Sequence, residues 1–222
     1  MSGKLVHIVD DRHASADPAI LKICQSYVHN CVQILAGAPL GSGFFPGDGH
    51  LIVTDWHVVE EHSRYVVRGC DEKCFYAGLY DVDKASDLAL ISIRVASNGP
   101  RIIGLPSITT NVVSSQDWRP GTEVVAIGFP TPSATPHVSP GTLMAVLPMA
   151  ETFNLIPKTE DPYRMMMVID AIVPAGMSGG PVFRLSDGAL IGVVSSSNEL
   201  DRMALVSPAE ELLRSLNFVR ME

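Results

Sequence analysis

The segment Ala175-Gly176-Met177-Ser178-Gly179-Gly180-Pro181 lies between two apolar runs, Met165–Ile169 and Leu190–Val194. Glycine in such a position costs conformational entropy and contributes no packing, so the segment is poor material for a core. It is typical of a tight turn that exposes one hydroxyl and directs amide N–H groups toward the group that the hydroxyl attacks. Read alone, it fits a glycine-rich hairpin loop equally well, because short Gly/Ser motifs recur by chance. The rest of the chain must therefore supply a base and an orienting acid.

Composition favours a globular, strand-rich protein. The 222 residues are 46% hydrophobic and 18% charged, and the 18 glycines and 16 prolines indicate many turns between short strands. The formal net charge of −8 argues against a nucleic-acid partner. No apolar run approaches the roughly 18 residues that span a membrane, and the N-terminus has no secretory apolar region, so we expect a cytoplasmic protein without a membrane partner. In that compartment Cys24, Cys31, Cys70 and Cys74 are expected to be reduced, although a Cys70–Cys74 bridge across a turn stays open.

The pattern along the chain predicts two β-rich halves within one domain, residues 1–222. The first half covers about 30–105 and the second about 120–207, with a connection at 94–119 and a loosely docked arm at 1–16. A helix is predicted over about 18–28, with Asp17 as its N-cap, and a closing helix after the capping-box pattern Ser207-Pro208-Ala209-Glu210. The predicted strands are 31–35, 41–45, 51–54, 64–67, 75–79, 88–93, 123–127, 142–147, 165–169, 181–183, 190–194 and 203–206, and residues 131–140 are predicted as a loop.

Two residues of the first half can serve Ser178. His57 follows an apolar strand, whereas His62 is surrounded by charged residues and is expected to face water. Asp87 directly precedes the apolar run 88–93, and a carboxylate at the edge of a buried strand costs several kcal/mol unless it has a partner. Asp81 and Asp83 are expected to face water. Histidine, aspartate and serine in this order are the components of a nucleophilic triad, and they match the order in chymotrypsin, a well-characterised enzyme of this kind.

The motifs around these residues resemble those of trypsin-like serine peptidases of the chymotrypsin fold, and most closely the HtrA/DegP-type protease domain. The matching segments are Gly41-Ser42-Gly43-Phe44, Thr54 with His57-Val58-Val59-Glu60, Asp87-Leu88-Ala89-Leu90, and Asp170-Ala171 with Gly176–Pro181. The resemblance covers about residues 30–207. It implies two packed antiparallel six-stranded β-barrels with short terminal helices, and an endopeptidase that uses no cofactor and no metal.

The resemblance also implies a role for each site residue. Ser178 would attack the scissile carbonyl, His57 would transfer the proton and Asp87 would orient His57. The amides of Gly176 and Ser178 would form the oxyanion hole. Ser195, Ser196 and Ser197 would pair with the substrate backbone as an added strand. With Ile172 and Val173 they would line the specificity pocket, which has no acidic floor and so favours small or medium apolar P1 residues.

Three departures from the family bear on control. Met177 stands where relatives have asparagine or aspartate, so activation by a new N-terminus is not expected, and control would act through loops, oligomerisation or a regulatory protein partner. No PDZ domain is expected after residue 222, unlike in most of the HtrA branch. Asp55-Trp56 is unusual before the histidine, and the sequence offers no reason for it. The partners expected are protein or peptide substrates.

Two further hypotheses compete with an active peptidase. A catalytically silent or partner-activated module of the same fold would bind peptides or proteins, and the three filled triad positions disfavour it. An esterase acting on small substrates would need a strand–serine–helix turn, and Pro181-Val182-Phe183 cannot continue as a helix after Ser178.

Overall fold

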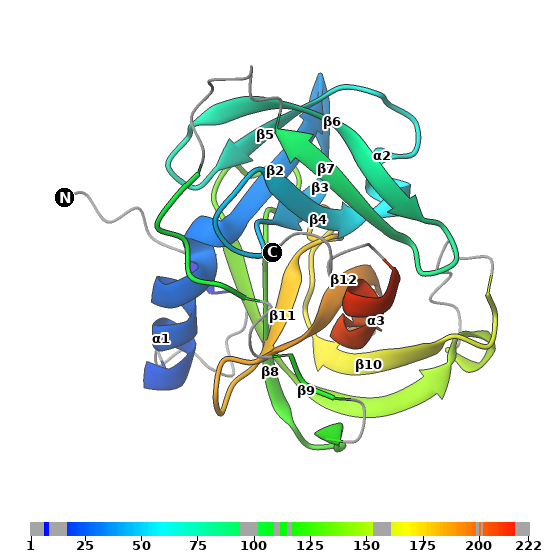
Figure 1. Cartoon of the computed structure of the whole chain (residues 1–222). Coiled ribbons are helices and arrows are strands. Elements are labelled where there is room, and N and C mark those ends of the chain that lie inside the picture. Colours follow the sequence, from blue (N-terminus) through cyan, green and yellow to red (C-terminus); the bar gives the residue numbers. More distant parts are fainter. Residues whose placement is uncertain are drawn as a thin grey trace.

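A computed structural model of the chain describes residues 7–8, 17–93, 102–108, 112–114, 117–152, 161–198, 200 and 202–215. Within this part, two β-barrels lie one above the other in Figure 1, with a helix near each end of the chain. This arrangement confirms the predicted all-β class.

The first barrel is closed by six antiparallel strands in the order β2-β3-β4-β7-β6-β5. Their bounds are β2 Cys31–Ala36, β3 Ala38–Phe44, β4 Leu51–Asp55, β5 Tyr65–Gly69, β6 Cys74–Asp83 and β7 Leu88–Ile93. A single turn of helix, α2 (Trp56–Val59), follows β4. The interior is filled by Ile34, Ile52, Val67 and Ile91, all fully buried, so this half has a core of its own.

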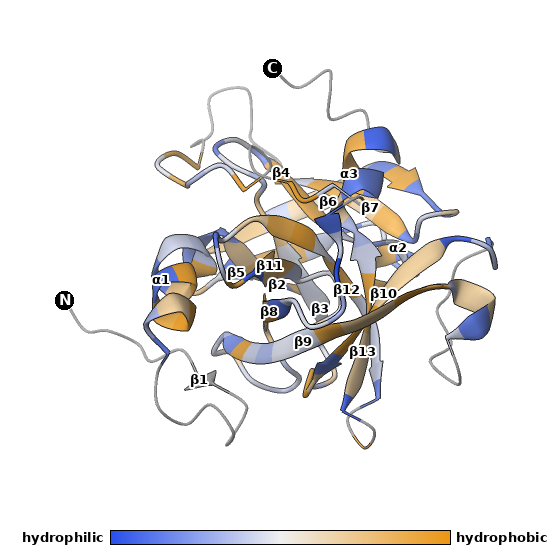
Figure 2. Ribbon diagram, turned by 90° about the horizontal axis from the view of Figure 1, so that it is seen from below, coloured by the Kyte–Doolittle hydropathy of each residue, from blue (hydrophilic) through white to orange (hydrophobic). Residues whose placement is uncertain are grey.

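The second barrel pairs β9-β10-β13-β12-β11-β8 and closes through β8 against β9. Its strands are β8 Glu123–Gly128, β9 His137–Pro148, β10 Met165–Ala171, β11 Pro181–Arg184, β12 Leu190–Asn198 and β13 Met203–Pro208, with the 3₁₀ turn η4 (Met149–Glu151) after β9. Figure 2 shows that β9 is a long ribbon along this barrel. The strand begins at His137, so the predicted loop over 131–140 is wrong at its end: Val138 and Ser139 are buried and pair with β8.

Another cluster of apolar side chains lies between the two barrels. It also includes residues of the N-terminal and C-terminal helices. It includes Phe44 and Leu90 of the first barrel, Phe129 and Phe183 of the second, and Ile20 of helix α1 (Pro18–Tyr27). Burying side chains of this size contributes about 1.5–3 kcal/mol each, which holds the barrels in one orientation. Any site formed across the barrel interface is therefore held in place by this shared core.

The elements near the two ends of the chain agree in part with those predicted from the sequence. Helix α1 begins as predicted, since Asp17 accepts a 2.7 Å hydrogen bond from the Ala19 amide, and the 3₁₀ turn η2 (Val28–Asn30) follows it. The predicted cap at Ser207 is wrong, because β13 continues through Pro208 and α3 runs from Ala209 to Ser215. Within the expected arm, β1 (His7–Ile8) pairs in parallel with β9, and its other residues lie outside the described ones.

Candidate active site

His57 and Asp87 meet because β4 and β7 are paired. Asp55 at the end of β4 lies opposite Leu88 at the start of β7, so α2 begins beside the turn that carries Asp87. The Nδ1 of His57 lies 2.7 Å from Oδ2 of Asp87, and the His57 amide donates to Oδ1 at 3.0 Å. Asp87 is fully buried, and its φ of +49° is in the left-handed region that aspartate tolerates better than most residues. Because an ionised carboxylate only accepts, Nδ1 carries the proton in this contact.

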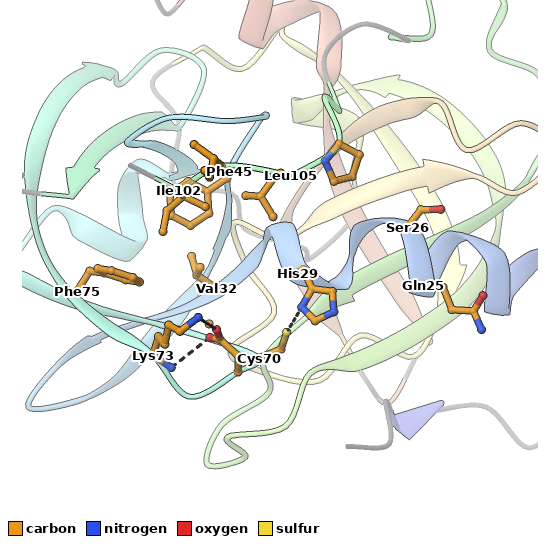
Figure 3. A pocket seen from close by; sticks show the side chains of 15 residues that line it. Gln25, Ser26, His29, Val32, Phe45, Cys70, Lys73, Phe75, Ile102 and Leu105 are labelled. Carbon is orange, nitrogen blue, oxygen red and sulfur yellow. Dashed lines mark hydrogen bonds and ion pairs between the residues drawn. The ribbon is translucent and has the colours of Figure 1, made fainter. Parts of the chain in front are cut away.

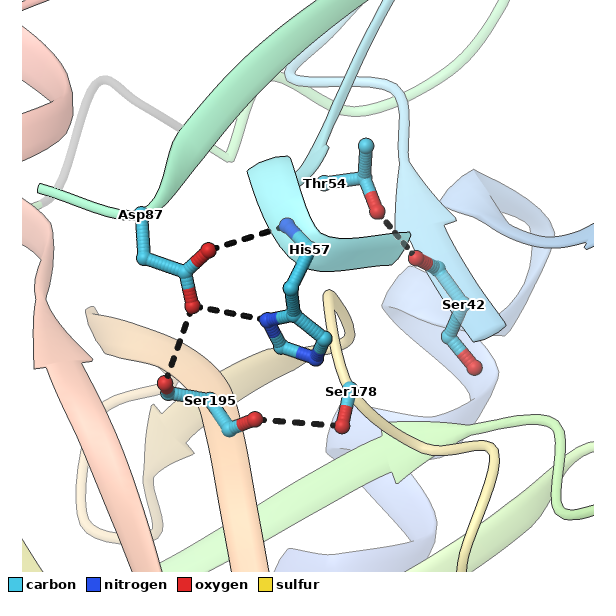
Figure 4. Close-up of polar contacts among 6 residues, drawn as sticks. All are labelled: Ser42, Thr54, His57, Asp87, Ser178 and Ser195. Carbon is cyan, nitrogen blue, oxygen red and sulfur yellow. Dashed lines mark hydrogen bonds and ion pairs between the residues drawn. The ribbon is translucent and has the colours of Figure 1, made fainter. Parts of the chain in front are cut away.

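Ser178 lies on the turn between β10 and β11. This turn is held by backbone bonds, since the Gly179 amide donates to the Val194 carbonyl at 2.8 Å and the Gly180 amide to the Met177 carbonyl at 3.0 Å. Figure 4 shows the His57 imidazole between the Asp87 carboxyl and the Ser178 side chain. The structure therefore brings together the three predicted triad residues, two from the first barrel and one from the second.

Ser195, on β12, contacts both Ser178 and Asp87. Its carbonyl accepts a 3.1 Å hydrogen bond from the Ser178 hydroxyl, and its own hydroxyl lies 3.4 Å from Oδ2 of Asp87 (Figure 4). The resemblance to HtrA-type proteases predicts Ser195 as a substrate-binding residue. The pattern does not indicate that its hydroxyl reaches Asp87, because that contact spans 108 residues.

Ser42 is a second residue whose role the sequence does not indicate. Its hydroxyl donates to the Gly176 carbonyl at 2.8 Å and accepts from the Phe129 amide at 2.8 Å. Its amide also donates to the Ser178 carbonyl at 2.8 Å, and its carbonyl accepts from the Thr54 hydroxyl at 2.7 Å. Ser42 thus fastens the serine turn to the first barrel. Its position in the Gly41–Phe44 motif is the one available signal.

The two predicted oxyanion donors lie on the same turn. Gly176 has φ +95°, a conformation that favours glycine, and a Cβ there would come within 2.6 Å of the Thr131 amide nitrogen. Among the described residues, the amides of Gly176 and Ser178 donate no hydrogen bond. Both N–H groups are therefore unoccupied by this part of the protein, as an oxyanion hole requires.

The remaining predicted residues differ in exposure. Val173 is 1% exposed and packs in the core of the second barrel, whereas Ile172, Ser196 and Ser197 are half-buried. The role of these four residues in substrate binding stays a prediction. Asp81 and Asp83 belong to β6 and are half-buried, so they do not lie in an open turn.

Met177 is fully buried in the same core as Val173, and the Ser139 hydroxyl lies 3.7 Å from its sulfur. An apolar side chain thus occupies the position directly before Ser178. Met177 packs with the apolar residues of this core.

Asp55 is the unexpected residue of the site. It is fully buried, and neither carboxyl oxygen has a hydrogen-bond partner among the described residues. Burial raises the pKa of Asp55 well above its usual range, and the nearby Asp87 adds to the rise, while His57, Arg164 and the Gly179 amide oppose it. One ligand atom each of Asp55, His57 and Asp87 lie within 4.8 Å of one another.

A separate cavity of about 720 Å³ lies between the helix α1, the β5–β6 turn and residues 102–106, and shares no residue with the triad (Figure 3). At its rim the Cys70 sulfur lies 3.0 Å from Nδ1 of His29. Burial raises the pKa of the Cys70 thiol, with Asp71 adding to the rise.

All four cysteines are free, so the open alternative of a Cys70–Cys74 bridge does not occur. Within the described residues, no helix has the length and apolar character needed to cross a bilayer.

Two closed antiparallel barrels, with a histidine–aspartate pair on one and a glycine-flanked serine turn on the other, define the chymotrypsin-like class. The family model for the trypsin-like peptidase domain matches residues 41–193, and the chain belongs to this family.

The relatives that match include HtrA- and DegP-type proteases. Serine protease HTRA1 of Xenopus tropicalis is 34% identical over 156 residues, which are 70% of this chain and 31% of the relative. A probable periplasmic serine endoprotease, DegP-like, of Rickettsia prowazekii is 32% identical over 155 residues, or 70% of this chain and 28% of that one. The matched part is thus about a third of the length of these relatives.

Solved structures agree on the fold. An inactive form of Rv3671c from M. tuberculosis superposes with a TM-score of 0.69 at 24% identity, covering 90% of this chain and 92% of that one. The HtrA-type protease AlgW with a decapeptide gives a TM-score of 0.69 at 18% identity, covering 87% and 65%. At these identities the likeness supports the two-barrel fold alone.

Proposed function

We propose that this chain is a serine endopeptidase whose catalytic residues are His57, Asp87 and Ser178. The observation that carries the proposal is the 2.7 Å contact between Nδ1 of His57 and the buried carboxyl of Asp87, placed beside the serine turn of the other barrel. A buried aspartate in this position holds the imidazole in the tautomer whose other nitrogen can accept a proton. Family membership gives independent support for peptide-bond hydrolysis.

The proposed reaction proceeds through an acyl-enzyme. Oγ of Ser178 attacks the scissile carbonyl carbon while Nε2 of His57 takes the hydroxyl proton, and Asp87 stabilises the resulting imidazolium. His57 then returns the proton to the leaving amine, and water repeats the sequence on the acyl group. The amides of Gly176 and Ser178 stabilise the oxyanion, and loss of one such donor typically lowers kcat about 100-fold or more.

Substrate binding is proposed along β12. Ser195, Ser196 and Ser197 would pair with an extended peptide, because β11 pairs with β12 only as far as Val193. The half-buried Ile172 would line the specificity pocket, and its apolar side chain favours small or medium apolar P1 residues. Cleavage of a mixed peptide library, with product sequencing, tests this preference: a majority of cuts after lysine or arginine would contradict it.

A fluorophosphonate probe tests the nucleophile directly. We expect the native chain to be labelled and the Ser178→Ala chain to remain unlabelled. Ser63→Ala, a change of an exposed serine, is the matched control and should label like the native chain. Equal labelling of the native and Ser178→Ala chains would overturn the proposal.

A partner-activated state is the second candidate function. The observation in its favour is that the Ser178 hydroxyl donates to the Ser195 carbonyl at 3.1 Å, which directs its proton away from the imidazole. Under this alternative the purified chain would label slowly, and addition of a protein partner would raise the rate. Fast labelling of the purified monomer removes this alternative.

We also propose an intracellular location, since four free cysteines suit a reducing compartment. Related proteases carry mitochondrial and periplasmic names, so the location is to be measured by cell fractionation. Recovery of the chain outside the cell would contradict it.

A further inference from the structure

Asp55, two residues before His57, has no explanation in the sequence but has an unusual environment in the folded chain. Asp55 ends β4 and is fully buried, yet neither of its carboxyl oxygens receives a hydrogen bond from the described residues. The Gly179 amide, a backbone donor whose proximity lowers the pKa of Asp55, donates its hydrogen bond to the Val194 carbonyl at 2.8 Å. A buried carboxyl without partners costs on the order of several kcal/mol, so a group that the described residues do not include is needed to satisfy it.

A second buried carboxyl lies beside it. Asp87 is also fully buried, and ligand atoms of Asp55, His57 and Asp87 all lie within 4.8 Å of one another. Within the described part of the chain, the Asp87 carboxyl has three hydrogen-bonding partners, which are the amide and ring of His57 and the hydroxyl of Ser195. The Asp55 carboxyl has no hydrogen-bonding partner in the same part. Arg164, the cation that also acts on Asp55, is already paired with Glu211. When ionised, the two carboxylates beside a neutral imidazole carry two negative charges, which one divalent cation would balance.

We propose that Asp55, His57 and Asp87 form a binding site for Zn²⁺. An oxygen–nitrogen–oxygen donor set with an imidazole suits zinc, whereas Ca²⁺ and Mg²⁺ prefer oxygen ligands alone. Zinc with ligands at about 2.1 Å needs donors roughly 3.4 Å apart in a tetrahedron, so the 2.7 Å contact of His57 with Asp87 opens slightly and Asp55 moves inward. A water or the Ser195 hydroxyl, 3.4 Å from Oδ2 of Asp87, completes the fourth position.

Zinc at this place makes the histidine unable to act as a base. The ion takes the lone pair of Nδ1, and the proton that Nδ1 carried moves to Nε2, so that the ring stays neutral. Nε2 then has no lone pair for the Ser178 proton. Any proton held by Asp55 leaves to solvent. Zinc is therefore a reversible inhibitor under the proposed function, while the binding itself does not depend on that function.

Binding is tested on the full chain as Ser178→Ala, which removes the nucleophile and none of the ligands. After treatment with a chelator, equilibrium dialysis against Zn²⁺ should give one tightly bound ion per chain. Asp55→Asn, which keeps the shape and removes the charge, should weaken binding at least tenfold, and Asp87→Asn should do the same. Circular dichroism and cooperative unfolding of each variant confirm that it is folded.

A matched control separates this site from the Cys70–His29 pair at the rim of the other cavity. Cys70→Ser removes the sulfur that lies 3.0 Å from His29 and should leave zinc binding unchanged. If Cys70→Ser abolishes binding and Asp55→Asn does not, the zinc belongs to the Cys70–His29 pair and the proposal is wrong. Absence of any bound zinc, or equal binding in the Asp55→Asn and parent chains, also overturns it.

Inhibition is measured separately with the fluorophosphonate probe on the chain with its native serine. Zinc should suppress labelling, a chelator should restore it, and the zinc concentration for half suppression should rise at least tenfold in Asp55→Asn, each chain being compared with its own metal-free labelling. A chain that binds zinc but never labels would contradict the proposed function and leave the zinc site intact. A chain that labels and binds no zinc would contradict the zinc site alone.

Discussion

The hydroxyl of Ser42, on the first barrel, donates a 2.8 Å hydrogen bond to the carbonyl of Gly176, which lies 134 residues later on the serine turn of the second barrel. The same hydroxyl accepts from the Phe129 amide at 2.8 Å. One side chain thus positions the carbonyl next to the proposed oxyanion donors and satisfies a buried amide. The two barrels share this contact at the point where their parts of the site meet.

Replacement of Ser42 by alanine should lower both activity and stability. Loss of both bonds leaves the Phe129 amide unsatisfied at a cost of about 1–3 kcal/mol in the free energy of unfolding. Misplacement of the serine turn by about 1 Å should lower kcat up to roughly 100-fold. Steady-state kinetics and urea unfolding measure the two effects, with Ser63→Ala as the control. An unchanged kcat in a folded Ser42→Ala chain would contradict the positioning role.

Gly179→Ala should be far more damaging than Gly121→Ala. Both glycines have a positive φ, +85° and +88°, so the backbone cost of about 1–2 kcal/mol for alanine in the left-handed region is common to both changes. A Cβ at position 179 would lie 2.1 Å from the Ser42 carbonyl oxygen, whereas one at position 121 meets nothing within 4 Å. We expect an excess destabilisation of about 2 kcal/mol or more, together with loss of probe labelling. Thermal unfolding of the pair measures the excess, and equal Tm values would show that the turn yields without cost.

The buried Met177 should behave as a core residue. Met177→Ala should destabilise the chain by about 2–5 kcal/mol, because it leaves a cavity in the second barrel. Met177→Leu nearly conserves the volume and should cost less than about 1.5 kcal/mol. Urea unfolding of both variants checks the difference. Equal stabilities of the two variants would mean that the side chain does not fill the core.

The pH dependence of stability should show the buried Cys24. Burial raises the pKa of its thiol from 9.0 to about 11, so the unfolded chain loses this proton at lower pH than the folded chain does. The stabilisation is therefore complete below pH 9.0 and is lost as pH rises toward about 11. Cys24→Ala should flatten this fall relative to its own stability at neutral pH, and Cys74→Ser, at an exposed position, should not. Urea unfolding across this range tests the difference, and an identical slope in Cys24→Ala would refute it.

The sequence indicated the strands and the candidate triad, because both depend on local signals. An apolar run such as 88–93 has few alternatives to a buried strand, and Asp87, His57 and Ser178 each stand beside one. The strand boundaries differ from the prediction where tertiary pairing overrides local propensity. The partner strand β8 draws His137–Pro140 into β9, and β12 holds Pro208 in β13.

Only the tertiary structure decided how the site is supported. The hydroxyls of Ser42 and Ser195 reach partners across 134 and 108 residues, and a hydrogen bond between groups so far apart leaves no periodic pattern in the chain. The same holds for Asp55, which the sequence marked only as unusual. Burial beside Asp87 and His57 is what makes its carboxyl costly, and that burial exists only once β4, β7 and the serine turn have packed together.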